Sequence, residues 1–128
     1  MNNATTTTTQ KPTLYKKLGE EPGVRKIVND SLDISSTNPL IAHHFRNTDM
    51  KKLKQLVFEF FSMGTGGPHT YTGRDMRTAH AGLKINEKEW ISATEDTVLA
   101  LDRNGIGQEE KDEVVAILES LKGDIVGV

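Results

Sequence analysis

The 128-residue chain contains no cysteine, and this absence narrows the chemistry open to it. Disulfide bonds, iron–sulfur clusters, thiolate zinc sites and cysteine nucleophiles are all excluded. The lack of cysteine is also typical of a protein from a reducing compartment. Any bound metal must therefore be held by histidine, by carboxylates or by a cofactor.

The chain also lacks a strong net charge and a long apolar run. Lys and Arg number 16 and Asp and Glu number 18, so the net charge is −2 and no basic field attracts nucleic acid or anionic lipid. No apolar run approaches the ~20 residues that span a bilayer, and the first residues lack the cationic and apolar regions of a signal peptide. We expect a soluble intracellular protein, cytoplasmic, with neither nucleic-acid nor membrane partners.

The N-terminal segment is rich in threonine and poor in apolar side chains. Between residues 1 and 13 only Met1 and Ala4 are apolar, too few to offset the entropy of ordering the backbone. We predict a disordered tail over residues 1–13 and one folded domain over residues 14–128. The tail has a single cation, Lys11, which disfavours a targeting peptide.

Apolar residues recur at three-to-four spacing through the domain, and glycine and proline are confined to the junctions. Because no segment alternates like a strand, the predicted fold class is all-α. Thr48 or Asp49 is the expected cap of the third predicted helix. The predicted elements are a turn at 14–18 and helices at 21–35, 39–45, 49–63, 74–83, 87–103 and 108–122.

Three of the four histidines have an unremarkable sequence setting. His43 and His44 are adjacent, so on a helix their side chains diverge by about 100°, which disfavours chelation of one ion. His69 lies in the glycine-rich loop at residues 64–73, where a solvated histidine is ordinary. None of these settings by itself predicts a ligand.

His80 differs because it projects from an apolar stripe that includes Met76 and Leu83. An imidazole there needs a partner, since an unsatisfied buried polar group costs ~1–3 kcal/mol. A backbone carbonyl or an iron would each serve. The sequence has no HExxH, P-loop, GxSxG or dinucleotide-binding motif, so no motif supports a hydrolase or phosphoryl-transfer function.

Several runs of residues are informative when they are taken together. They are Leu14-Tyr15-Lys16-Lys17-Leu18-Gly19, His44-Phe45, Asn47-Thr48-Asp49-Met50, Phe60, Gly66-Gly67-Pro68, and Tyr71-Thr72-Gly73-Arg74-Asp75-Met76-Arg77-Thr78-Ala79-His80. The most specific is the Gly-Arg-x-Met-x-x-Ala-His run that ends at His80. Over about residues 13–128 the sequence resembles the group I truncated haemoglobins, and it departs from them at the first glycine pair, where Glu20 follows Gly19.

The resemblance implies a shortened globin, a two-over-two helical sandwich around haem b (iron protoporphyrin IX). His80 corresponds to the proximal iron ligand, and Phe45 to the phenylalanine that packs against the haem. Phe61 falls where some members line a gas tunnel, with plain core packing as the alternative. The cofactor-binding residues expected from the resemblance are Phe45, Lys52, Leu53, Leu56, Val57, Phe60, Arg74, Met76, His80, Leu83, Trp90 and Val98.

The distal side departs from the family, whose members usually carry Tyr, Gln, His or Lys there as hydrogen-bond donors to bound oxygen. A hydrogen bond to a charged acceptor contributes ~1.5–3 kcal/mol, so its loss would speed oxygen release about 10–150-fold. Whether Gln55 or Ser31 turns inward to replace the donor stays open. The predicted ligand pocket is apolar and is formed by Leu32, Leu53, Leu56, Val57 and Phe61.

We therefore predict a haem globin that reversibly binds O₂, CO or NO, as a monomer or weak dimer. Enzyme activity is left open, because NO dioxygenation would need an external reductase. One alternative is a six-coordinate electron-transfer protein in which His43 or His44 supplies the sixth iron ligand. The other is a haem-free interaction module in which His80 is structural.

Overall fold

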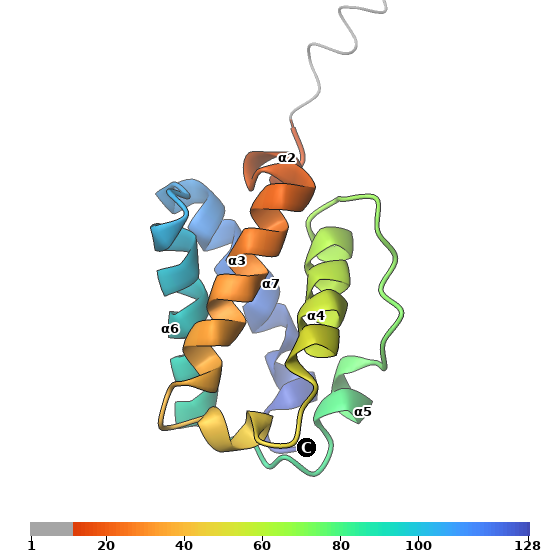
Figure 1. Cartoon of the computed structure of the whole chain (residues 1–128), viewed down its shortest axis with the longest axis vertical. Coiled ribbons are helices and arrows are strands. Elements are labelled where there is room, and N and C mark those ends of the chain that lie inside the picture. Colours follow the sequence, from red (N-terminus) through yellow and green to blue (C-terminus); the bar gives the residue numbers. More distant parts are fainter. Residues whose placement is uncertain (1–11) are drawn as a thin grey trace, which may run out of the picture.

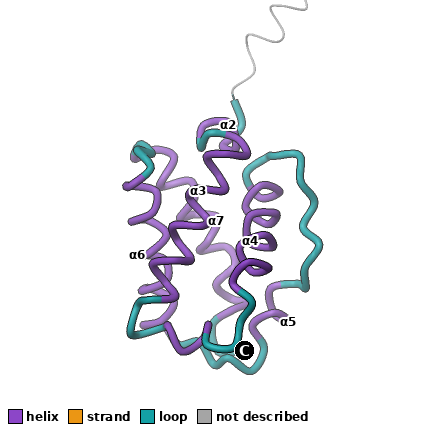
Figure 2. Tube along the Cα trace, in the orientation of Figure 1, coloured by secondary structure: helices purple, strands orange, loops and turns teal. Residues whose placement is uncertain are grey.

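A computed structural model describes residues 12–128, which contain helices, turns and loops and no strand (Figure 2). The predicted all-α class is therefore confirmed. Residues 1–11 of the predicted tail lie outside the described part. The elements are α2 (Leu14–Lys17), α3 (Glu20–Ser36), the 3₁₀ helix η1 (Ala42–Phe45), α4 (Met50–Gly64), α5 (Met76–His80), α6 (Glu87–Arg103) and α7 (Gln108–Ile125).

The long helices form two antiparallel pairs. The chain descends in α3 and rises in α4, then rises in α6 and descends in α7 (Figure 1). The two pairs meet where α3 packs closely along α6. Within residues 12–128, no helix has both the length and the apolar character needed to cross a bilayer.

The hydrophobic core lies where α2, α3, α6 and α7 meet one side of α4. Burial of these side chains follows from the three-to-four spacing in the sequence, which places them on one face of each helix. The buried cluster comprises Leu14, Tyr15, Leu18, Val24, Ile27, Val28, Phe58, Leu101 and Val114.

Capping residues set several helix boundaries where the sequence predicts them. Asp49 accepts a hydrogen bond from the Lys52 N–H at 3.2 Å and so caps α4. Asn86 begins α6 with a reciprocal capping box that includes Glu89. At the altered glycine pair, Glu20 keeps a left-handed backbone with φ 59°, a conformation that costs a non-glycine residue about 1–2 kcal/mol.

The helix that carries His80 is shorter than the predicted range of 74–83. Asp75 caps α5 by accepting from the Thr78 N–H at 3.2 Å, so the helix begins at Met76. It ends at His80 because Ala81 adopts an extended ψ of 133° and Gly82 a left-handed φ of 84°. The prediction was wrong at both ends, since neither the cap nor this backbone reversal shows in the apolar spacing.

Candidate functional site

The imidazole of His80 is oriented by its own helix. Its Nδ1 lies 2.7 Å from the main-chain carbonyl oxygen of Met76, one turn earlier. Because a carbonyl oxygen only accepts hydrogen bonds, Nδ1 carries a proton, and in the neutral imidazole the lone pair is then on Nε2. Within residues 12–128, Nε2 has no hydrogen-bond partner, and the side chain is half-buried. The arrangement leaves a directed nitrogen ligand.

The short α5 is fixed in place through the C-terminal part of the chain. It packs on α7, and the chain end is linked to the residues after α5 by main-chain hydrogen bonds. The Gly82 N–H donates to Val128 O at 3.3 Å, and the Gly127 N–H donates to Ile85 O at 2.9 Å. These bonds position a helix that is too short to be stable alone.

The loop between α4 and α5 runs along the edge of the molecule (Figure 1) and is attached to α4. Glu59 accepts hydrogen bonds from the Thr72 hydroxyl at 2.7 Å and from its N–H at 3.0 Å. The rings of Phe60 and Tyr71 meet edge-on with centroids 5.2 Å apart. The Tyr71 hydroxyl in turn donates to the main-chain oxygen of Arg74, close to the start of α5. The contacts connect α4 to the helix that carries His80.

Helix α4 has two apolar faces with different environments. One face carries Phe58, which is 1% exposed and lies under the Arg25 guanidinium, 3.9 Å from its ring centroid. Sequence reasoning missed Phe58, because periodicity alone did not show which apolar face packs on α3. The second face stays half-buried although it is wholly apolar; its residues are Leu53, Leu56, Val57, Phe60 and Phe61.

The other predicted haem contacts differ in burial. Phe45, Met76 and Val98 are half-buried. Trp90 is 7% exposed, and its indole N–H donates to Glu119 of α7 at 3.2 Å. This side chain therefore links α6 to α7. The structure leaves three predicted contacts exposed, namely Lys52, Arg74 and Leu83.

The residues of the predicted ligand pocket adjoin the core. Leu32, Val57 and Phe61 pack against the buried cluster. Phe61, together with Phe60, also lines a small apolar pocket between α4 and α7. The remaining lining residues are Gly64, Thr65, Val114, Ile117, Leu118 and Leu121.

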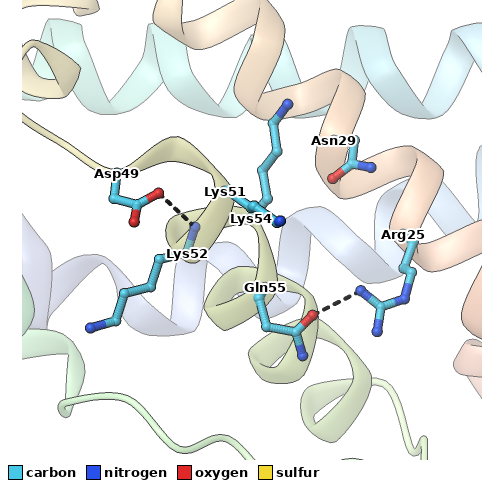
Figure 3. A pocket seen from close by; sticks show the side chains of 7 residues that line it. All are labelled: Arg25, Asn29, Asp49, Lys51, Lys52, Lys54 and Gln55. Atoms are coloured by element: carbon cyan, nitrogen blue, oxygen red, sulfur yellow. Dashed lines mark hydrogen bonds between the residues drawn. The ribbon is translucent and has the colours of Figure 1, made fainter.

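The two polar residues considered as replacement donors are both engaged elsewhere. The amide oxygen of Gln55 accepts from Arg25 at 2.9 Å, and its amide nitrogen donates to Glu59 at 3.1 Å. Figure 3 shows this amide turned toward Arg25 in a polar groove between α3 and α4. The Ser31 hydroxyl is paired with that of Thr97 at 3.0 Å. Both side chains thus have polar partners away from the apolar face of α4.

His43 and His44 are brought together rather than held apart. Their ring centroids lie 4.1 Å apart, and both Nε2 atoms face the same Oε2 of Glu89, at 3.4 Å and 3.1 Å. The expected divergence of the two side chains was wrong. Helical spacing fixes only the Cα–Cβ directions, and the side-chain torsions turn both rings toward one carboxylate. The Asn86 N–H, and then His44 and His43, lower the pKa of the Glu89 carboxyl, while burial opposes the shift.

The sequence comparisons agree with this geometry. The model of the bacterial-like globin family matches residues 13–126. The chain belongs to this family. It is 27% identical over 115 residues to a group 1 truncated haemoglobin of Tetrahymena pyriformis, covering 90% of this chain and 95% of that protein. A group 1 truncated haemoglobin of a Nostoc species is 27% identical over 114 residues, covering 89% and 97%.

Solved structures of truncated haemoglobins share the fold. The Fe(III) form of the Tetrahymena pyriformis protein superposes with a TM-score of 0.88 at 26% identity, covering 91% of this chain and all (100%) of that one. The 2/2 haemoglobin of Synechococcus, in the cyanomet state with covalently attached haem, has a TM-score of 0.84 at 29% identity, covering 91% and 100%. The chain is therefore a haem-binding globin with the two-over-two helical arrangement.

The residues present fit a haem. His80 supplies a directed nitrogen whose proton is held on the other side of the ring. The second apolar face of α4 is half-buried by protein and presents apolar surface against which a large flat apolar group can pack. An iron ligand on α5 and an apolar surface on α4 are thus both present, and a haem requires both.

Proposed function

We propose that this globin reversibly binds a diatomic gas, O₂, CO or NO, on haem b whose iron is ligated by Nε2 of His80. The observation that carries the proposal is the hydrogen bond from Nδ1 of His80 to Met76 O, which leaves Nε2 as the ligating atom. When bound, the haem would supply an iron that can take a gas ligand, with His80 as the residue that would hold it.

The chain's own residues would hold the haem between its helices. From the η1 and α5 sides, Phe45 and Met76 would contact it, both half-buried in this structure. Lys52 and Arg74 are proposed partners of the propionates, because both are exposed cations. The contacts proposed on α4 are Leu53, Leu56, Val57 and Phe60.

The gas would enter an apolar pocket formed by Leu32, Leu53, Leu56, Val57 and Phe61. Gln55 is bonded to Arg25 and Glu59 and Ser31 is paired with Thr97, which supports a pocket without a distal donor from either side chain. An apolar pocket stabilises a polar ligand poorly, so this proposal includes fast oxygen release and weak discrimination against CO. The role supported is oxygen or NO chemistry or sensing rather than tight storage.

The pocket between α4 and α7 supports a gas path beside the proposed haem. Phe61 lines this pocket and also packs against the buried cluster, and Val114 of that cluster lines the pocket too. The lining has no charged side chain. Such a path admits a small apolar gas while disfavouring water.

A haem titration of the full chain tests the proposal. We expect uptake of about one haem per chain, a five-coordinate ferrous spectrum, and complete conversion on adding CO. Oxygen displacement by CO in a stopped-flow instrument then gives the oxygen dissociation rate. Failure to take up haem, or a ferrous spectrum that CO leaves unchanged, would overturn the proposal.

A further inference from the structure

A second set of metal-ligating side chains meets where η1 contacts the first turn of α6. Glu89 has a nearly buried carboxylate, with a side chain 9% exposed, and His44 is 14% exposed. His43 is 45% exposed and gives the site access to solvent. The three donor atoms lie within 4.8 Å of one another. The cluster thus joins residues 45 positions apart in the sequence.

The carboxylate is oriented by the capping box of α6. Its Oε1 accepts a hydrogen bond from the Asn86 N–H at 3.0 Å, which leaves Oε2 directed at the two imidazoles. Metal ligands in proteins are commonly held in this way, by a hydrogen bond to the atom that does not bind the ion. The Glu89 carboxylate therefore needs no rearrangement of α6 to act as a ligand.

The two distances from the carboxylate to the imidazoles match the ligand spacing around a small tetrahedral ion. Zinc binds nitrogen and oxygen at about 2.0–2.1 Å, which places neighbouring tetrahedral ligands about 3.3 Å apart. The Oε2 of Glu89 lies 3.4 Å from Nε2 of His43 and 3.1 Å from Nε2 of His44. Two imidazoles and one carboxylate are also a donor set that zinc uses, with solvent in the fourth position.

We propose that His43, His44 and Glu89 form a binding site for a divalent transition-metal ion, Zn²⁺, separate from the haem iron. The ion replaces the proton that His44 shares with Glu89 and draws both imidazoles onto one centre. Since η1 then becomes attached to α6 by coordinate bonds, the ion also fixes the segment that ends at Phe45. The site uses no residue assigned above to the haem.

Isothermal titration of the haem-loaded full chain with zinc chloride tests this site. The wild-type chain is expected to show one tight binding event. His43→Asn removes an exposed ligand without disturbing the buried carboxylate. Zinc affinity should fall by at least about tenfold, because loss of a group that only hydrogen-bonds to a metal ligand already weakens binding by about 10-fold or more. X-ray absorption of the zinc-loaded wild type should show two imidazoles around the ion.

A matched control comes from the other group of donors, the carboxylates of Glu109, Glu110 and Glu113 near the start of α7. Glu113→Gln should leave the tight event unchanged. Equal zinc affinity in the wild type and His43→Asn, or loss of the tight event in Glu113→Gln, would overturn the proposal. The haem spectrum should be the same in all three proteins, so a failure here is distinct from a failure of the haem assignment.

Discussion

Nδ1 of His80 lies 2.7 Å from the carbonyl oxygen of Met76, and both residues belong to the same five-residue helix. The hydrogen bond stops the ring from turning and fixes its tautomer. A helix this short has little stability of its own, so its cap and its contacts with α7 control where Nε2 points.

The cap of α5 is expected to matter for haem retention. Asp75→Ala leaves the N–H of Thr78 without its acceptor, which loosens the turn that holds His80. Haem transfer to an apomyoglobin trap should become between about 2-fold and 30-fold faster, the range that loss of an N-cap produces. Asp75→Asn keeps an acceptor and should transfer haem at the wild-type rate. Equal rates in all three proteins would argue against control by the cap.

The same cap predicts a pH dependence. Hydrogen bonds from the Thr78 hydroxyl and N–H lower the pKa of the Asp75 carboxyl. A lowered pKa means that the stabilisation is present above the ordinary aspartate value of about 3.9 and is lost as pH falls through the folded value. Haem loss from the wild type should therefore accelerate more than from Asp75→Asn as pH falls from about 5 to 3. Parallel pH profiles of the two proteins would contradict this.

The close approach of Gly67 to α4 is expected to exclude any side chain. A Cβ at Gly67 would lie 2.3 Å from Ser62 Oγ and 2.5 Å from Tyr15 Cδ1. Gly67→Ala should lower the free energy of unfolding by about 1–3 kcal/mol, the usual cost of overpacking. Gly64→Ala is the control, since a Cβ there meets nothing within 4 Å. Chemical denaturation measures both, and equal stabilities would show that the loop adapts.

A distal donor introduced by substitution should slow oxygen release. Leu32, one of the residues proposed to form the ligand pocket, packs against the core. Leu32→Tyr adds a hydroxyl that can donate to bound oxygen, and the dissociation rate should fall by about 10–150-fold. Leu32→Phe adds the ring alone and should have little effect. Stopped-flow displacement of oxygen by CO measures the dissociation rates. Equal rates in the wild type and Leu32→Tyr would contradict an apolar pocket without a donor.

The imidazoles of His43 and His44 are not expected to bind the haem iron. Both rings face Glu89 of α6, and either would have to leave that carboxylate to reach the proposed haem site. Replacing both with alanine should therefore leave the ferrous spectrum unchanged. If the wild type were six-coordinate and the double variant five-coordinate, the electron-transfer alternative would be correct instead.

The sequence predicted the helices best where caps and spacing agree. The range 87–103 matches α6, because Asn86 and the glycines after Arg103 mark both ends. Spacing alone overextended α5, since the extended backbone at Ala81 has no apolar signature. For α6 the capping residue located the start of the helix, whereas for α5 apolar periodicity alone did not locate either end.

Parts of the candidate site could be predicted from local sequence, and other parts depend on tertiary contacts. His80 stood out in the sequence because a polar ring sat on an apolar stripe, and its carbonyl partner is one helical turn away. The convergence of His43 and His44 on Glu89 depends on a tertiary contact, which local spacing cannot show. The burial of Phe58 likewise depends on which face of α4 meets α3.

The most direct test of the haem assignment is the ferrous absorption spectrum of the haem-reconstituted His80→Gly variant, recorded with and without imidazole in solution. The account predicts that the wild type is five-coordinate, that the variant loses this spectrum, and that added imidazole restores both it and clean conversion by CO. A His80→Gly protein with the wild-type spectrum and no response to imidazole would show that His80 is not the iron ligand.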